Sequence, residues 1–359
     1  MSSSGNILDY TLASVKDYTA QSAHSILDLL IDDGIATKRE KEKDGKLYIG
    51  KMSEKQGLSF CLSRVNDSIK NIEKWEFDKT YRYSMLFEVY NFNKDVFEEL
   101  VEKHDAFWYD KINEYEELYP VIQKPSIVKD CDNGIYTLKF NLRLDATDAF
   151  GNNLKKRYSV LSIFYTKENL LEIRFDGIAA QFSKDKFYFA QNTLSWIRTY
   201  MKIGLQAVQL FETVDYIKRH GNKNEVVLSG QDMLMASGGK ATIDIGNNDK
   251  ELLPFIGELK AIMEEYADEF DKAPELKTAL DDFIYEKENL SEFPWVKFRF
   301  GEKVIEVKFT FNYSEENGCL LQHLYSPLIS NQGRERMDYV TNYIIDVRNI
   351  IAELPDDRG

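Results

Sequence analysis

Two side chains that suit metal-assisted chemistry lie in the strand-like segment 304–311. Glu306 and Lys308 are two residues apart there, and side chains two apart in a strand point to the same face of a sheet. A carboxylate in this position can hold a divalent ion, and a neighbouring ammonium can orient or polarise a water molecule. The pattern therefore allows metal-dependent hydrolysis, with Mg²⁺ as the implied cofactor.

The Glu-x-Lys arrangement resembles that of restriction-like nucleases, in which an Asp on the preceding strand completes the site. The preceding segment here, WVKFRFG at 295–301, contains no acid. The nearest acid on a predicted strand is Asp244, about sixty residues earlier. The resemblance covers three residues and implies a catalytic set of Glu306, Lys308 and Asp244.

An ordinary charge pattern explains the same residues, and we prefer it. Acidic and basic side chains alternate with apolar ones on the water-facing side of many antiparallel sheets, where they pair across strands. Glu172 and Arg174 repeat the pattern with arginine in place of lysine. We therefore expect Glu306 to pair with Lys297 or Arg299 on the adjacent strand.

Three basic segments with interleaved aromatic residues, 38–51, 155–158 and 184–202, are candidates for nucleic-acid binding. If they converge in space, they would follow a phosphate backbone and offer stacking surfaces. Each segment alone is typical of a solvated surface. The candidate nucleic-acid-binding residues are Lys155, Lys156, Arg157, Arg198 and Lys202.

Other kinds of site have no support in the sequence. The three cysteines, Cys61, Cys131 and Cys319, are far apart and odd in number, which excludes a disulfide framework or a zinc motif. The glycine pair before Lys240 lacks the spacing of a phosphate-binding loop. We expect no bound metal or cofactor outside the nuclease alternative. No apolar run reaches the roughly 18 residues of a membrane span, so we expect a cytoplasmic protein without membrane contact.

The negative charge is concentrated in one segment. The net charge is −14, and residues 249–292 alone hold 14 acidic and 5 basic residues. Because phosphate binding depends on local patches, the total charge does not exclude nucleic acid. The segment itself predicts an exposed acidic surface that engages a basic partner or a basic face of the same protein.

Hydrophobic periodicity places the elements that carry these residues. We expect a helix over 7–31, broken once, and a charged hairpin around Asp44-Gly45. A strand over 81–90 and a helix from Asn93 to Tyr115 follow. Strands within 136–177 form an antiparallel meander, and a long helix spans 191–220. The C-terminal part has two acidic helices divided near Pro274, strands at 295–300, 304–311 and 320–325, and a helix over 334–353.

These elements predict an α+β fold, with a helical N-terminal region followed by two antiparallel sheet-plus-helix blocks separated by an acidic helical pair. We expect domains at 1–120, 121–230 and 231–359. The predicted function is a non-catalytic interaction subunit of a multi-component cytosolic assembly, with a protein partner or self-association. The uneven charge would suit an accessory component of prokaryotic cells, such as one of antiviral defence. The alternatives are the magnesium-dependent nuclease and a nucleic-acid-binding protein that uses the basic segments.

Overall fold

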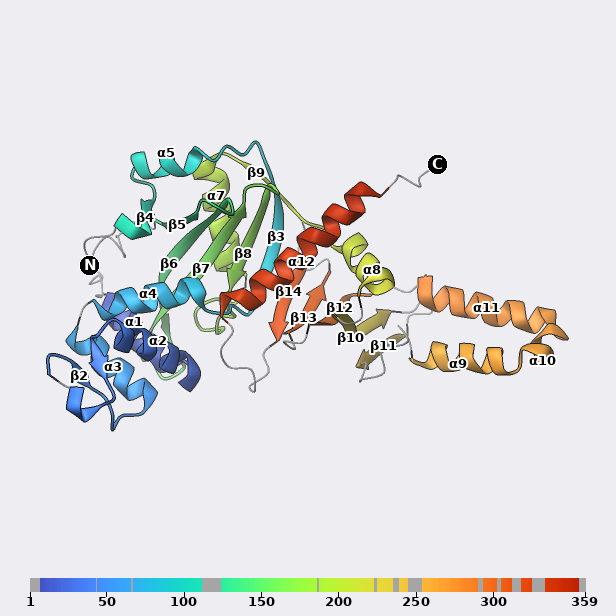
Figure 1. Cartoon of the computed structure of the whole chain (residues 1–359), viewed down its shortest axis with the longest axis horizontal. Coiled ribbons are helices and arrows are strands. Elements are labelled where there is room, and N and C mark those ends of the chain that lie inside the picture. The colour runs from blue at the N-terminus through green and yellow to red at the C-terminus, as the bar shows by residue number, and fades with distance from the viewer. Residues whose placement is uncertain are drawn as a thin grey trace. The chain divides into compact units, whose positions relative to one another are not determined.

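The protein has a mixed α+β fold, as predicted, and divides into two compact units (Figure 1). The computed structural model describes residues 7–42, 44–65, 67–111, 124–185, 187–222, 225–234, 239–244, 254–289, 293–301, 305–311, 318–324 and 333–354. Unit 1 comprises residues 1–206 with 330–335, and unit 2 comprises 207–329 with 336–359. The chain thus divides near residue 206, whereas the sequence predicted boundaries at 120 and 230. The N-terminal helices and the first meander share one unit because helices pack directly on the meander.

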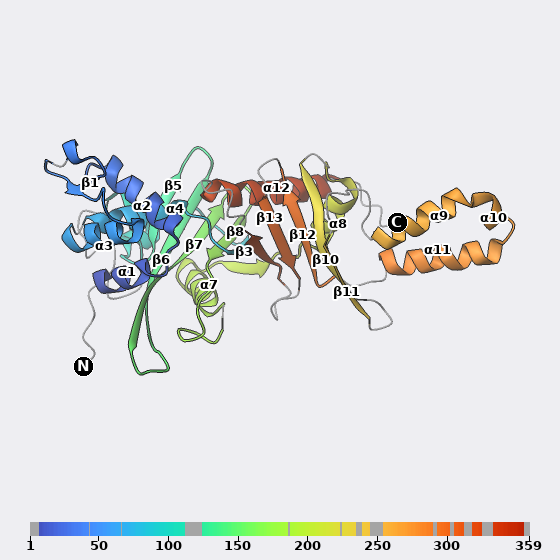
Figure 2. The ribbon, with the colours of Figure 1, turned by 90° about the horizontal axis from the view of Figure 1, so that it is seen from below.

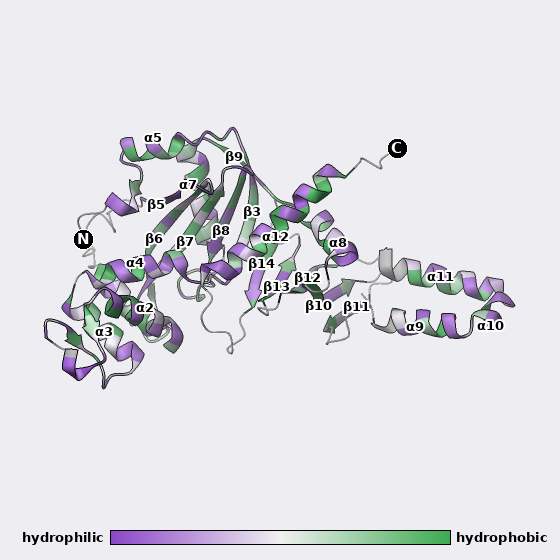
Figure 3. Ribbon diagram, in the orientation of Figure 1, coloured by the Kyte–Doolittle hydropathy of each residue, from purple (hydrophilic) through white to green (hydrophobic). Residues whose placement is uncertain are grey.

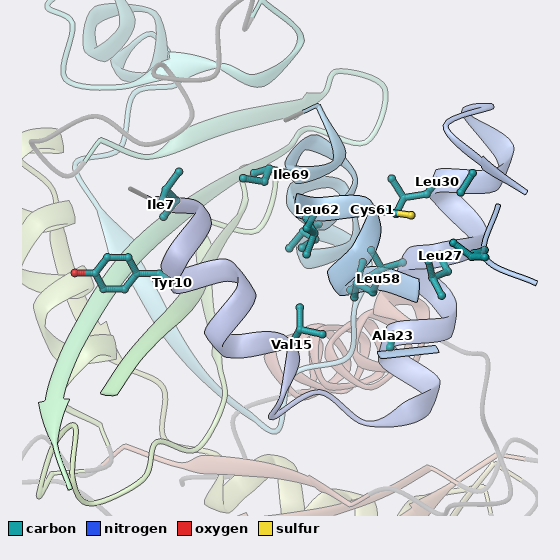
Figure 4. Close-up of a cluster of buried hydrophobic side chains, with 14 residues drawn as sticks. Ile7, Tyr10, Val15, Ala23, Leu27, Leu30, Leu58, Cys61, Leu62 and Ile69 are labelled. Atoms are coloured by element: carbon teal, nitrogen blue, oxygen red, sulfur yellow. The ribbon is translucent and has the colours of Figure 1, made fainter. Parts of the chain in front are cut away.

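Four helices form the N-terminal part of unit 1: α1 (Ile7–Val15), α2 (Ala20–Asp32), α3 (Glu54–Arg64) and α4 (Ser68–Asp78). The break between α1 and α2 was predicted. Thr19 caps α2, because its hydroxyl accepts a hydrogen bond from Ser22 N at 3.0 Å. A capping box between Ser53 and Gln56 starts α3. The apolar stripes of these helices meet in one buried cluster (Figure 4), which includes Ile7, Val15, Ile26, Leu27, Leu30, Leu58, Leu62 and Ile69.

Two local predictions in this region are wrong. Strands β1 (Ala36–Thr37) and β2 (Leu47–Tyr48) pair in parallel and do not form a hairpin. A 3-10 helix at Glu40–Glu42 carries the chain between them, which lets both Ala36 and Ile49 reach the buried core. The helix predicted from Asn93 is only α5 (Val96–Glu102), because His104 adopts a left-handed conformation with φ 59°.

The chain after α5 becomes extended as β4 (Phe107–Trp108), which pairs in parallel with β5 (Ser126–Asp130). The rest of the predicted helix, to Tyr115, lies outside the described residues. The meander follows as predicted, with β6 (Ile135–Thr147), β7 (Asn153–Tyr165) and β8 (Leu170–Phe175). With β3 (Tyr83–Tyr90), the strand order in unit 1 is β3-β8-β7-β6-β5-β4.

The two faces of the unit 1 sheet are covered by different helices. On the apolar face, Tyr136 stacks on Phe97 of α5, and Phe140 meets Trp196 of α7 (Tyr188–Met201) edge to face. The opposite face carries polar side chains and is covered by α1 and α4. A helix on each face means that the polar side chains of this sheet are also buried.

The long helix predicted over 191–220 is in fact three elements. Helix α7 ends at Lys202, which has φ 56° and a left-handed conformation. A short strand β9 (Gly204–Ala207) then pairs with β3, and α8 (Phe211–His220) begins after it. The apolar spacing continues across the break because Ala207 at the end of β9 and Val208 after it are also buried, so periodicity alone could not reveal the break.

The strands of unit 2 pair antiparallel in the order β11-β10-β12-β13-β14. They are β10 (Val226–Leu234), β11 (Lys240–Asp244), β12 (Trp295–Phe300), β13 (Ile305–Thr310) and β14 (Leu320–Leu324). Helix α12 (Arg334–Glu353) has the predicted bounds. It packs on the apolar face, where the rings of Tyr343 and Phe300 are 5.5 Å apart. Helices α9 (Pro254–Glu265), α10 (Ala267–Asp271) and α11 (Pro274–Asn289) are inserted between β11 and β12.

The α12 packing gives a first prediction. Ile344 is fully buried, and truncating a buried Ile to Ala costs about 2–5 kcal/mol through lost burial and a residual cavity. Ile344→Ala should therefore lower the free energy of unfolding by that amount in a denaturant titration. Ile350→Ala in the same helix is the control, because Ile350 is 44% exposed. Equal effects of the two variants would contradict the packing of α12.

Candidate functional site

Glu306 and Lys308 lie on the same face of β13, as the sequence predicted, and β13 pairs with β12. In the register of the two strands, Glu306 is opposite Arg299 and Lys308 is opposite Lys297. The guanidinium of Arg299 donates from Nη2 to Glu306 Oε1 at 3.2 Å. The expected pairing of Glu306 with the adjacent strand is therefore present.

The backbone of Asp244 lies on a strand away from this pair. It is at the end of β11 opposite Gly230, and the side chain lies outside the described part of the structure. Strands β10 and β12 separate β11 from β13, which at about 4.8 Å per strand is roughly 14 Å. A single ion binds its oxygen ligands at about 2.0–2.2 Å. Carboxylates on strands this far apart therefore cannot both bind the same ion. Across the described ranges, no group of three or more His, Cys, Asp or Glu side chains is placed to hold a metal ion.

The predicted nucleic-acid-binding residues are distributed over both sides of unit 1. Lys155 and Lys156 pair with Asp9 at 3.0 Å and Asp17 at 3.1 Å. In the segment 38–51, Lys38 pairs with Glu54 at 3.1 Å. The cations of these two segments are thus partly neutralised by carboxylates of the N-terminal helices.

Arg198 lies in α7, which covers the apolar face of the sheet, and Lys202 is the C-cap residue that follows it. Arg198 donates to the carbonyl of Leu205 at 3.4 Å, and Lys202 is the residue that ends the helix. Arg157 projects from the polar face and is buried under α4. The structure therefore does not bring Arg157 together with Arg198 and Lys202.

Arg157 belongs to a buried network of four charged side chains. Glu73 and Glu76 come from α4, Lys139 from β6 and Arg157 from β7, and all four are buried. Lys139 Nζ lies 2.7 Å from Glu73 Oε1 and 3.0 Å from Glu76 Oε2. Arg157 donates to Glu73 Oε2 and, from Nε, to Glu76 Oε1, both at 2.7 Å. Two cations and two anions thus neutralise each other inside unit 1.

The electrostatics of this network follow from competing effects. Burial alone would raise the pKa of Glu76, but the charges of Arg157 and Lys139 outweigh it and lower that pKa to about 2. Burial would likewise lower the pKa of Arg157, and Glu76 and Glu73 raise it instead. Glu76 and Arg157 therefore stay ionised at neutral pH. The sequence prediction missed this network because it missed α4, although Ile69, Ile72 and Phe77 carried a helical spacing.

A cavity of about 650 Å³ adjoins the network within unit 1. Its walls come from the α1–α2 turn, the end of α4, the start of β3, part of β7 and the segment that follows β8. Four aromatic rings line it, those of Tyr18, Trp75, Tyr83 and Tyr158, together with Glu76, Arg157 and the Lys79–Asp176 ion pair. The lining holds charges of both signs but includes no His or Cys among the described residues. Such a cavity suits binding of a flat, charged ligand more than covalent catalysis.

The most exposed feature of unit 2 is the helical hairpin of residues 254–289, which we call the acidic arm. Figures 1 and 2 both show α9 and α11 side by side, extending from the strands β10 and β11 of the same unit. Its base is anchored by a small cluster in which Met233, Ile256 and Ile284 are buried. Between residues 261 and 283 no side chain is buried. The arm contains 11 acidic and 4 basic residues.

Apolar side chains are exposed among the carboxylates of the acidic arm. Ile262, Tyr266 and Leu276 are each about half exposed, at 49%, 50% and 54%. Figure 3 shows hydrophilic and hydrophobic residues interleaved along these helices. No helix in the described ranges is long and apolar enough to cross a membrane. Exposed apolar side chains on a helix supply area that a groove of another protein can bury.

The position of Glu306 gives a second prediction. Incubation of the wild-type protein with plasmid and single-stranded nucleic acids in Mg²⁺ or Mn²⁺ should give no cleavage, because Glu306 is paired with Arg299 and Asp244 is three strands away. Gel electrophoresis measures the products. Cleavage that is lost in both Glu306→Ala and Lys308→Ala would contradict this and support the nuclease alternative.

The buried network gives a third prediction, on pH. The folded pKa of Glu76 is about 2, below its ordinary 4.5. Its ionisation therefore stabilises the fold above the ordinary pKa, and this contribution is lost as pH falls towards 2. Glu76→Gln should lower the free energy of unfolding by about 3–5 kcal/mol at pH 7, because a buried cation loses its partner.

The loss should shrink as the pH is lowered from 5 towards 2, where the wild-type carboxyl also becomes neutral. Denaturant titrations across that range measure it. Glu168→Gln, at an exposed site, is the control and should show no such trend. A Glu76→Gln effect that is constant with pH would show that the carboxylate charge does not contribute.

Comparison with known proteins does not assign a family or a function to this chain. A scan against protein-family models finds no match for the chain, and a search of the curated proteins finds no significant relative. The function is therefore inferred from the residues and contacts of the chain itself.

Proposed function

We propose that the protein is a non-catalytic interaction subunit of a multi-component cytosolic assembly, and that the acidic arm is its docking element. The observation that carries this proposal is the exposure of the arm, in which no side chain between residues 261 and 283 is buried. A helical hairpin that only stabilised its own unit would be expected to bury one apolar stripe along its whole length. This arm buries apolar side chains fully only at its base.

The charge and apolar content of the arm define the chemistry of the partner. With 11 acidic and 4 basic residues, the arm attracts a basic surface and steers its approach. The exposed Ile262, Tyr266 and Leu276 supply apolar area that a partner groove can bury. A basic surface with an apolar groove is therefore the partner that fits.

The other two functions have less support from the geometry. The ion pair between Glu306 and Arg299 and the distance of Asp244 weigh against a nuclease site. The carboxylates beside Lys155, Lys156 and Arg157 weigh against phosphate binding there, since an incoming phosphate would have to displace them. Docking through the acidic arm requires no such rearrangement.

The fourth prediction tests the arm with a probe of matching chemistry. The probe is a fluorescein-labelled amphipathic helical peptide built from leucine and lysine repeats, and binding is measured by fluorescence anisotropy. The wild-type protein should bind it, and raising the salt should weaken binding because charges are screened beyond about 10 Å at 0.1 M. The arm-reversed variant, with Glu264→Lys, Glu265→Lys, Asp268→Lys and Glu269→Lys, should bind more than about tenfold more weakly, because like charges then meet.

The matched control reverses four exposed acids of unit 1, with Asp44→Lys, Glu102→Lys, Asp132→Lys and Glu168→Lys. It changes the net charge equally and should retain binding through the intact arm. Circular dichroism of both variants checks that the helices persist. Equal loss of binding in the two variants would attribute the effect to net charge and contradict a docking role for the arm.

A further inference from the structure

One face of the unit 2 sheet has the opposite charge to the acidic arm. We call it the basic face, and it consists of Lys240, Lys297, Arg299 and Lys308 around the ring of Trp295. Alternation along the strands places these side chains on the face opposite to Val296, Phe298 and Phe300, which are buried. Lys240 is 62% exposed, and the other members are half-buried.

Two cations of the basic face are directly opposite each other. Lys297 on β12 and Lys308 on β13 are register partners, and like charges opposite each other on antiparallel strands are destabilising. Lys308 Nζ lies over the Trp295 ring, 4.1 Å from its centroid. Burial lowers the pKa of Lys308, and the charges of Lys240 and Lys297 lower it further against the opposing effect of Asp232.

The described acids of this face already have basic partners within it. Asp232 Oδ2 lies 2.7 Å from Lys240 Nζ, and Glu306 pairs with Arg299. The four cations of the basic face outnumber its two described acids, so an additional anion on this face would lower the repulsion between its cations. The acidic arm is the part of this protein that offers a row of exposed carboxylates.

The anchoring of the arm prevents it from covering the basic face of its own chain. Its base packs with Met233, Ala241 and Ile243, which alternate along β10 and β11 with Asp232 and Thr242. The arm is therefore attached on the face opposite to the basic face. To fold back onto the basic face, it would have to give up its buried contacts with Met233.

We infer that two copies of this chain associate, with the acidic arm of each copy lying across the basic face of the other. The inference rests on the proposed docking function of the arm and names its partner. Helix α11 has 16 residues, or about 24 Å at 1.5 Å per residue. The five strands of unit 2 span about 19 Å at 4.8 Å per strand, so one helix is long enough to cross all five.

A two-fold arrangement satisfies both contacts at once and closes the assembly at two copies. The exposed Tyr266 and Leu276 of the arm then meet the face around Trp295, which adds apolar burial to the charge contacts. Because most of the attraction is between charged side chains at a surface, the association weakens with increasing salt.

The test measures molecular mass in solution by sedimentation equilibrium at low salt. The wild-type protein should have twice the 41.8 kDa of one chain. The arm-reversed variant defined above should be monomeric, since two basic surfaces then meet. A face-reversed variant, Lys297→Glu with Lys308→Glu, should be monomeric because two acidic surfaces meet. In each case the dimer dissociation constant should rise by more than about tenfold.

The decisive variant combines the arm and face reversals in one chain. Its arm is basic and its face acidic, so the dimer should form again, which a variant that merely fails to fold cannot do. The matched control reverses two exposed lysines of unit 1, with Lys51→Glu and Lys184→Glu, and should remain dimeric. A folded combined variant that stays monomeric would overturn the inference.

Other outcomes separate this inference from the proposed function. A wild-type monomer whose arm still binds the leucine-lysine peptide would overturn self-association and leave the docking function standing. If the arm-reversed variant and the combined variant both still bind the peptide as the wild type does, the docking function and the self-association are both contradicted. In another outcome, the wild-type protein binds a labelled oligonucleotide that the face-reversed variant does not bind, while both proteins have the same molecular mass in solution. That result would assign the basic face to nucleic acid and overturn the inference.

Discussion

The architecture of unit 1 depends on the buried network of Glu73, Glu76, Lys139 and Arg157. Removing four charges from water costs several kcal/mol per ion, and the cost is offset only because each cation contacts both carboxylates. These contacts require α4 to lie at one position and one rotation over β6 and β7. The network thus specifies how the helical region docks on the sheet, and it also forms one wall of the adjoining cavity.

The strands of the two units show that the same alternating pattern leads to different surfaces. In unit 1 the polar residues of β6 and β7 are covered by a helix that brings opposite charges. In unit 2 the polar residues of β12 and β13 stay half exposed and pair within the sheet, as Arg299 does with Glu306. A covered polar face contributes to the specificity of the fold, whereas an open one remains accessible to a partner. The basic face is of the second kind.

Local patterns in the sequence were sufficient for much of the secondary structure, but not for contacts between distant elements. The strand Trp295–Phe300 and the helix Arg334–Glu353 have the predicted bounds because alternation and apolar spacing are local. The same locality placed Glu306 and Lys308 on one face. The distance of Asp244 depends on the strand order of the sheet, which no short motif encodes. Arg157 looked like a solvated cation because its carboxylate partners lie about eighty residues away on α4.

Because of its position in the topology, the acidic arm can change in sequence without affecting the stability of the sheet. The chain leaves the edge strand β11 into the arm and returns as β12, which pairs with β10 and not with β11. The arm is thus inserted between strands that are not paired with each other, so its length and charge can change without altering the register. Its fully buried contacts are confined to Met233, Ile256 and Ile284 at the base. Substitutions beyond that base should leave folding almost unaffected, which is the property that the proposed docking role requires.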